Sequence, residues 1–139
     1  MPRIEHVNLT VREIEPTKNF LLAAFPQWRV RAQGPNVWHG VTRNWIHIGD
    51  DDFYLSLYDG GTGPMRDLSS VTCGLAHIGL EVESIENLIA NLKNAGFEVD
   101  HFGDEHPHRK NAYFMDPQGL EFEFVEYFTD IGSLKNQYC

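Results

Sequence analysis

The chain is poor in cysteine, in basic residues and in long apolar runs. Its two cysteines, Cys73 and Cys139, are too few for a disulfide framework. The 11 basic and 20 acidic residues give a formal net charge of −9, which argues against a nucleic-acid backbone or an anionic membrane as partner. No apolar run approaches the roughly 18 residues that a membrane span needs, and the N-terminal residues show no signal-peptide pattern. We therefore expect a cytoplasmic protein whose 139 residues form one domain.

What the sequence does contain is an internal repeat. Residues 4–11 (IEHVNLTV) match residues 75–82 (LAHIGLEV), and a histidine stands at the same place in each, His6 and His77. Both segments alternate apolar and polar residues, as half-buried strands do. Because each histidine opposes the aliphatic positions, both are predicted on the face of their strands that looks away from the aliphatic side.

A helix and several strands are predicted after each of these segments. Ser84 is a candidate helix N-cap and Gly96 a candidate helix stop, while Pro16 and Pro26 bracket an earlier helix. Strand-like runs follow at residues 27–31, 37–42, 45–48 and 53–58 in the first half and at 97–102, 112–115 and 120–127 in the second.

Both halves are interpreted as β-α-β-β-β units. We expect a first module over about residues 3–59, a linker over 60–72, a second module over 73–128 and a peripheral tail over 129–139.

The last predicted strand carries a carboxylate between two phenylalanines. Phe122 and Phe124 share one face, so Glu123 points to the other, the side predicted for His6 and His77. Two imidazoles and one carboxylate suit a divalent metal with open coordination positions, and with iron they form the facial triad of non-haem oxygenases. The residues leave an alternative open, in which the histidines are hydrogen-bonded structural residues and Glu123 is solvated or ion-paired.

These segments resemble the vicinal oxygen chelate superfamily, also called the glyoxalase, bleomycin-resistance and extradiol-dioxygenase superfamily. The resemblance runs from Ile4 to about Tyr127 and is most specific where an Asp-Pro-x-Gly turn, residues 116–119, precedes the strand with Glu123. It implies an α+β fold of two tandem β-α-β-β-β modules that form a cup-shaped sheet around a metal. It also implies a homodimer.

The resemblance further implies a ligand set. By motif, the four metal positions fall on His6, Ser56, His77 and Glu123. Ser56 departs from the glyoxalase I-like enzymes, which have glutamate there, and from epimerase relatives, which have glutamine. A set of three ligands, His6, His77 and Glu123, is similar to that of the extradiol dioxygenases and the fosfomycin-resistance transferases.

The resemblance also suggests proton-transfer residues. Extradiol dioxygenases carry a histidine and then a tyrosine ahead of the same turn, an order that His106 and Tyr113 follow. His108 is a further candidate, and each of these groups can exchange a proton with a bound oxygen. The alternative is that residues 106–109 are a polar loop tip.

Two classes of function remain. The first is a metal-dependent enzyme, a dioxygenase, lyase or transferase, that binds a small substrate with vicinal oxygens through Fe, Mn, Ni or Zn. The second is a non-catalytic binder similar to the bleomycin-resistance proteins, lined by aromatic side chains. Basic residues that could bind an anionic substrate group, or simply pair on the surface, are Arg29, Arg31, Arg43, Arg109 and Lys110.

Overall fold

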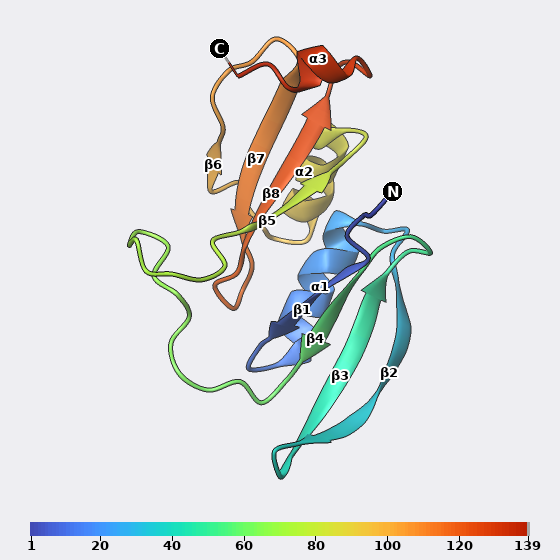
Figure 1. Ribbon diagram of the computed structural model, residues 1–139, viewed down its shortest axis with the longest axis vertical. Coiled ribbons are helices and arrows are strands. Elements are labelled where there is room, and N and C mark those ends of the chain that lie inside the picture. The colour runs from blue at the N-terminus through green and yellow to red at the C-terminus, as the bar shows by residue number, and fades with distance from the viewer. Residues whose placement is uncertain (139) are drawn as a thin grey trace. The chain divides into compact units, whose positions relative to one another are not determined.

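The computed structural model describes residues 1–138 and divides into two compact units (Figure 1). Unit 1 comprises residues 1–64 and unit 2 begins at Met65. Each unit contains a four-stranded mixed sheet with a helix packed on it, so the predicted α+β class is confirmed. No helix within residues 1–138 is long and apolar enough to span a bilayer.

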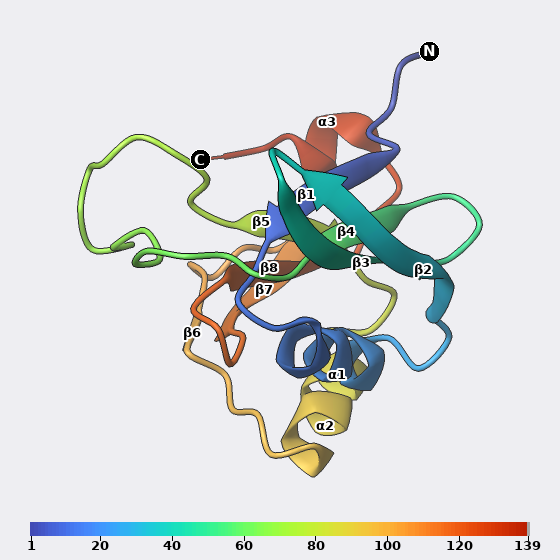
Figure 2. The ribbon, with the colours of Figure 1, turned by 90° about the horizontal axis from the view of Figure 1, so that it is seen from below.

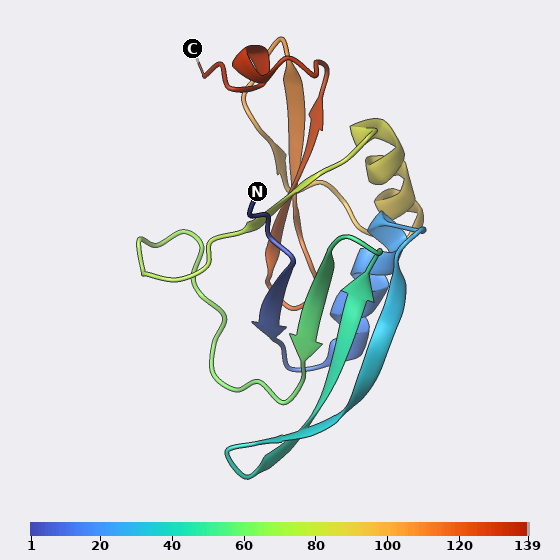
Figure 3. The ribbon, with the colours of Figure 1, turned by 45° about the vertical axis from the view of Figure 1, so that its right-hand side comes forward.

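Unit 1 follows the order β-α-β-β-β. Its elements are β1 (His6–Thr10), α1 (Ile14–Ala24), β2 (Arg29–Trp38), β3 (Val41–Gly49) and β4 (Tyr54–Tyr58). The sheet order is β1-β4-β3-β2, in which β1 and β4 are parallel and the other pairs antiparallel. α1 covers one face of this sheet (Figure 3). Its Phe20 and Leu21 are fully buried, and so are Ile48, Leu55 and Leu57 of the strands.

Unit 2 repeats this arrangement. Its elements are β5 (Ile78–Glu81), α2 (Ile85–Asn94), β6 (His101–Phe102), β7 (Arg109–Met115), β8 (Glu121–Tyr127) and α3 (Gly132–Lys135). The sheet order β5-β8-β7-β6 matches that of unit 1, again with one parallel pair, β5 with β8. The β-α-β-β-β repeat inferred from the two histidine segments is thus the repeat of the fold.

Helix α2 begins and ends where the sequence predicts. The hydroxyl of Ser84 accepts a hydrogen bond from the backbone N–H of Asn87 at 3.2 Å, the contact of an N-cap. Gly96 has a φ of 90°, and its N–H and that of Phe97 donate to the carbonyls of Lys93 and Leu92. This pair of bonds is a Schellman motif, which requires a residue of left-handed conformation at that place.

The strand predicted over residues 37–42 is wrong, because the chain reverses in its middle. β2 and β3 form one long hairpin, and His39 and Gly40 lie in its turn with φ values of 46° and 79°. Two consecutive positive φ values match the twist of paired strands, so a two-residue turn closes the hairpin. The apolar residues Val37, Trp38 and Val41 stand on both sides of this turn and made the segment resemble one strand.

The segment after β8 packs against unit 2. Figure 2 shows α3 on the opposite side of the sheet from α2. The ammonium of Lys135 lies 3.4 Å from a carboxylate oxygen of Glu81 and 4.4 Å from the ring centroid of Tyr127. Arg109 lies against the ring of Tyr138, 4.9 Å from its centroid. The tail therefore touches the sheet face that α2 leaves free.

Candidate metal centre and its surroundings

Every candidate metal ligand lies on the face of its sheet that neither α1 nor α2 covers, here called the helix-free face. In β4, Leu55 and Leu57 point toward α1, so Ser56 points the opposite way. In β8, Phe122 and Phe124 are fully buried and Glu123 points the opposite way. The predicted alternation of side chains between the two sheet faces is therefore confirmed in β4 and in β8.

In unit 2, His77 and Glu123 are in direct contact. The Nε2 atom of His77 lies 3.0 Å from Oε2 of Glu123, and its Nδ1 atom lies 3.4 Å from Oε1 of Glu121. The side-chain amide of Asn111 donates to the other oxygen of Glu123, Oε1, at 2.8 Å. Glu123 is thus held from two sides, with one oxygen directed at the imidazole.

Tyr113 completes this cluster from the neighbouring strand. It stands opposite Glu123 in the register of β7 and β8. Its ring meets His77 edge-on at 5.6 Å and stacks on His101 at 4.2 Å. Burial, and then the charge of Glu123, raise the pKa of the Tyr113 hydroxyl above its ordinary value. The hydroxyl therefore keeps its proton at neutral pH.

A glycine makes room for this arrangement. The backbone N–H of Gly103 donates to the carbonyl of Asn111 at 3.1 Å, so the two residues stand side by side. A Cβ atom added to Gly103 would overlap the side-chain amide of Asn111. The Asn111 amide can occupy this position, and donate to Glu123, because glycine at residue 103 has no Cβ atom.

In unit 1, His6 is oriented by a carboxylate in the same way. Its Nδ1 atom lies 2.5 Å from Oε2 of Glu5, and its ring stacks on Tyr54 with centroids 4.9 Å apart. The hydrogen bond from His6 is the main cause that lowers the pKa of Glu5, and the Tyr54 hydroxyl contributes a further hydrogen bond. In both units, then, the candidate imidazole presents Nδ1 to a glutamate.

Ser56 lies where the resemblance implies a fourth ligand. It stands between Asn8 of β1 and His47 of β3 in the strand register. Its hydroxyl oxygen is buried, and no residue within 1–138 gives it a hydrogen-bond partner. A neutral hydroxyl is a poor ligand for a divalent ion, so of the two unit 1 candidates, Ser56 and His6, His6 has the better donor chemistry.

His106 and His108 lie in the loop between β6 and β7. The Nε2 atom of His106 donates to the carbonyl of Gln137 at 2.8 Å, and its Nδ1 atom accepts the backbone N–H of His108 at 3.1 Å. Both ring nitrogens of His106 are therefore occupied by backbone groups of the loop and the tail. The ring of His108 meets that of His106 edge-on at 5.8 Å.

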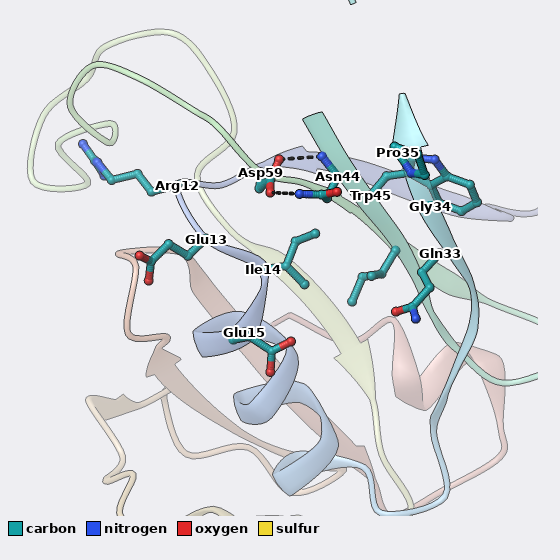
Figure 4. Close-up of a pocket in the computed structure, with 11 residues that line it drawn as sticks. Arg12, Glu13, Ile14, Glu15, Gln33, Gly34, Pro35, Asn44, Trp45 and Asp59 are labelled. Carbon is teal, nitrogen blue, oxygen red and sulfur yellow. Dashed lines mark hydrogen bonds between the residues drawn. The ribbon is translucent and has the colours of Figure 1, made fainter. Parts of the chain in front are cut away.

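Each unit has a cleft beside its sheet. One of about 760 Å³ in unit 1 lies between the first turn of α1 and β3, where Asn44 donates to Asp59 from its backbone and its side chain (Figure 4). It includes Ile46, which faces α1, so it lies on the helix side of the sheet. The other, of about 790 Å³ in unit 2, is lined by His106 and Asn111 among others. It borders the residue that holds Glu123.

Within residues 1–138, no three His, Cys, Asp or Glu side chains form a cluster able to hold a metal ion. Unit 2 by itself offers the pair His77 and Glu123, and unit 1 by itself offers His6. The donor chemistry nevertheless fits a divalent ion, because two ligands about 2.1 Å from one ion at a right angle lie about 3 Å apart. That is the separation of His77 Nε2 and Glu123 Oε2.

The supporting residues were not predicted as site residues. Glu121 and Asn111 share strand parity with Glu123 and Tyr113, so the alternation could have indicated them. Glu5 could not be found in this way, because it precedes β1 and its side chain does not follow the strand's alternation. The ring of Tyr54 lies beside His6 because β1 and β4 are neighbours, which is a property of the sheet order.

Solved structures of the same fold resemble this chain. The glyoxalase family protein from Enterococcus faecalis is 26% identical, with a TM-score of 0.72 over 89% of this chain and 97% of its own. The glyoxylase/bleomycin resistance protein/dioxygenase domain from Frankia sp. EAN1pec is 23% identical, with a TM-score of 0.70 over 91% and 98%. The fosfomycin resistance protein FosX from Listeria monocytogenes, complexed with Mn(II) and sulfate, is 14% identical, with a TM-score of 0.67 over 99% of each.

Sequence comparison identifies the family. No protein with a curated description matches the chain. A profile of the Glyoxalase/Bleomycin resistance protein/Dioxygenase superfamily matches residues 3–124, which include both histidine segments and the strand with Glu123. The matched region and the duplicated β-α-β-β-β fold agree, and the chain belongs to this superfamily.

Proposed function

We propose that the protein is a metal-dependent enzyme whose ion, Fe, Mn, Ni or Zn, is held by His6, His77 and Glu123. Its substrate is a small molecule with vicinal oxygens that chelate the ion. The observation that carries the proposal is the pair His77 Nε2 and Glu123 Oε2, 3.0 Å apart, with the Nδ1 atom of His77 turned toward Glu121. A ligating histidine in proteins typically donates its other nitrogen to a carboxylate or carbonyl.

His6 supports the same assignment. Its Nδ1 atom faces Glu5 at 2.5 Å, which leaves Nε2 to bind an ion. Three protein ligands leave open positions for two substrate oxygens, and the similar protein FosX was solved with Mn(II). Ser56 is not a ligand in this proposal, so a glyoxalase-type fourth carboxylate is absent from the reaction.

The chain's own residues would bind, orient and exchange a proton. When bound, a divalent ion supplies Lewis acidity to the chelated oxygens. Asn111 holds Glu123 in place, and Glu5 and Glu121 fix the orientation of the imidazoles. Tyr113 keeps its proton at neutral pH and is the donor to a substrate oxygen that gains charge. Because both nitrogens of His106 are engaged, it and His108 have a smaller part in the proposal than Tyr113.

Metal titration tests the proposal. Protein stripped with a chelator is titrated with Mn(II), and free Mn(II) is followed by electron paramagnetic resonance for the wild type, His77→Ala and Glu123→Gln. We expect one ion per chain and an affinity loss of roughly 100-fold or more in each variant, since even supporting residues cost 10- to 100-fold. His39→Asn is the control, because it removes an exposed hairpin imidazole and keeps a residue that tolerates a positive φ.

Equal Mn(II) affinity in all four proteins would contradict the ligand assignment.

The second candidate function, a metal-independent binder, is favoured by the aromatic side chains Tyr54, Tyr58 and Trp45 on the helix-free face of unit 1. Catechol, which carries two vicinal oxygens, separates the two functions as a probe. Stabilisation by catechol that survives the chelator supports the binder, and stabilisation that requires Mn(II) supports the enzyme. Sedimentation analysis tests the homodimer that the family resemblance predicts.

A further inference from the structure

One arginine differs from all the others. Within residues 1–138, six of the seven arginines donate to a carboxylate or a carbonyl: Arg3 to Asp52, Arg12 to Gly63, Arg29 to Asp51, Arg43 to Asp59, Arg66 to Thr72 and Arg109 to Lys135. The guanidinium of Arg31 has neither a hydrogen bond nor an ion pair with any residue in that range. Its five N–H donors therefore have no protein acceptor within the described residues.

The backbone directs Arg31 onto the helix-free face of unit 1. Val30 pairs with Ile48 and Ala32 pairs with His47, so the register shifts at Arg31 and the residue is inserted between two paired positions. Such a bulge re-aims a side chain, and bulges are common beside active sites. The guanidinium carbon lies 4.5 Å from the ring centroid of Tyr54. Stacking on a buried ring holds the charge in place without using its N–H donors.

The same ring brings Arg31 close to the proposed ligand. Tyr54 stacks on His6 at 4.9 Å and contacts His47 at 4.5 Å. The carboxylate of Glu5 is engaged by His6 at 2.5 Å and by the Tyr54 hydroxyl, and it forms no ion pair with Arg31. The five N–H donors of Arg31 are therefore available beside the imidazole of unit 1.

Arg43 shows what an arginine with a purely structural role looks like on the same face. Its guanidinium also lies over a tyrosine of β4, Tyr58, at 4.9 Å. Its donors, however, are used by the carbonyl of Asp59 at 2.8 Å and the hydroxyl of Thr10 at 2.9 Å. The two arginines share the stacking and differ in whether their donors have partners.

We propose that Arg31 is an anion-binding subsite that takes the carboxylate or phosphate group of a small molecule. The planar fork of a guanidinium matches two oxygens of such a group with two parallel hydrogen bonds. Its position beside Tyr54 and His6 makes it a subsite for an anionic substrate. That last assignment rests on the proposed function, whereas the anion site itself does not.

Nuclear magnetic resonance of the metal-stripped protein tests the subsite directly. The Nε–Hε signal of Arg31 is assigned as the one that Arg31→Lys removes. Acetate and inorganic phosphate are then titrated, with chloride at equal ionic strength as the reference. We expect a saturable shift of the Arg31 signal with at least one of the two probes. The signals of Arg29 and Arg43 should move no more than they do in chloride.

Variants give the second readout. Arg31→Met keeps an unbranched side chain over Tyr54 and removes the charge, and it should weaken binding of the probe by roughly 10-fold or more. Arg29→Met, in the same strand but taken from an arginine paired with Asp51, should leave the affinity unchanged. Circular dichroism is used to check that both variants fold.

A shift that does not saturate, equal shifts of Arg29 and Arg31, or unchanged affinity in Arg31→Met would each overturn the subsite. Arg31→Lys retains the charge without the fork, so its weaker binding keeps the test valid even if Arg31→Met does not fold. Because no metal is present, failure of the Mn(II) titration would leave this result intact. In that case the anion site would still be supported, and only its role in the proposed reaction would be contradicted.

Discussion

Unit 1 and unit 2 have the same sheet order and register but different side chains on the helix-free face. Ser56 opposite His47 in unit 1 takes the place of Glu123 opposite Tyr113 in unit 2. The unit 2 pair belongs to a hydrogen-bonded cluster with a carboxylate, whereas the serine hydroxyl of unit 1 has no partner within residues 1–138.

The helix-facing side does not show this divergence. Leu55 and Phe122 occupy corresponding register positions, opposite Val7 and Ile78, and both are fully buried. The apolar side of each sheet thus fixes the fold, and the other side is free to carry different chemistry. The comparison predicts that exchanging helix-free residues between the units changes the site without changing the fold.

Ser56→Glu is the exchange with the largest expected effect. It places in unit 1 the carboxylate that unit 2 has, but in a buried position without the asparagine that holds Glu123. Without metal, an unpaired buried carboxylate should lower the free energy of unfolding by roughly 3 kcal/mol. Urea denaturation of metal-stripped protein at neutral pH measures this loss.

Ser56→Gln is the matched control, since it has the same size and no charge. If Ser56→Glu is as stable as Ser56→Gln, the position does not impose the burial that the comparison assigns to it. Added Mn(II) should restore more stability to Ser56→Glu than to Ser56→Gln, because only the carboxylate is a good ligand.

A glycine in each unit gives the second comparison. Gly34 stands opposite Trp45 in unit 1, and Gly103 stands beside Asn111 in unit 2. A Cβ on Gly34 would meet the Trp45 ring at an ordinary 3.5 Å, whereas a Cβ on Gly103 would overlap the Asn111 amide. Gly103→Ala should therefore displace Asn111 from Glu123 and weaken Mn(II) binding by about 10- to 100-fold.

Gly34→Ala serves as the control and should bind Mn(II) like the wild type, while Asn111→Ala should weaken binding as Gly103→Ala does. The same Mn(II) titration measures all three. Equal affinity in Gly103→Ala and Gly34→Ala would show that the Asn111 contact does not position Glu123.

Much of the fold can be predicted from the alternation of apolar and polar residues along the chain. The positions of His6, His77 and Glu123 on the helix-free faces are decided by the parity of apolar neighbours such as Leu55 and Phe122. The turn at Asp116 follows from local chemistry as well, since its carboxylate accepts the backbone N–H groups of Gln118 and Leu120.

The contacts of the site do not follow from alternation. Parity gives the face of a side chain but not the strand that lies beside it, so Asn111 beside Glu123 and Tyr54 beside His6 emerge only from the sheet order. Arg31 is itself an inserted residue, which shifts the alternation that a strand pattern assumes. Glu5 reaches His6 from outside β1, where no strand periodicity applies.

A smaller change in stability is expected when Ser56 or Ser84 is replaced by alanine, and its sign should differ between the two serines. Ser56 buries a hydroxyl without a partner, so Ser56→Ala should leave stability unchanged or raise it by about 1 kcal/mol. Ser84 caps α2 through its hydroxyl, so Ser84→Ala should lower stability by about 1 kcal/mol. Urea denaturation measures both, and a loss of the same size in both variants would contradict the assignment of Ser56 as unpartnered.

The smallest expected effect is a pH dependence confined to unit 1. Burial, and then the charges of His6 and Arg31, lower the pKa of His47 below its ordinary value of 6.5, while Glu5 opposes this shift. Between the folded and unfolded pKa values the unfolded chain binds more protons, so stability rises with pH there. The contribution of His47 is therefore complete above about pH 6.5 and is lost as the pH falls through its folded pKa.

Because His47 is partly exposed, solvent screening keeps this contribution below about 1 kcal/mol. Urea denaturation at about pH 7.5 and about pH 5.5 should show a smaller loss of stability on acidification in His47→Gln than in the wild type. Tyr113, at the corresponding position of unit 2, has a raised pKa and does not titrate in this range. Tyr113→Phe should therefore shift stability equally at both pH values, and an equal response of His47→Gln and the wild type to acid would exclude His47 as the source of the difference between the units.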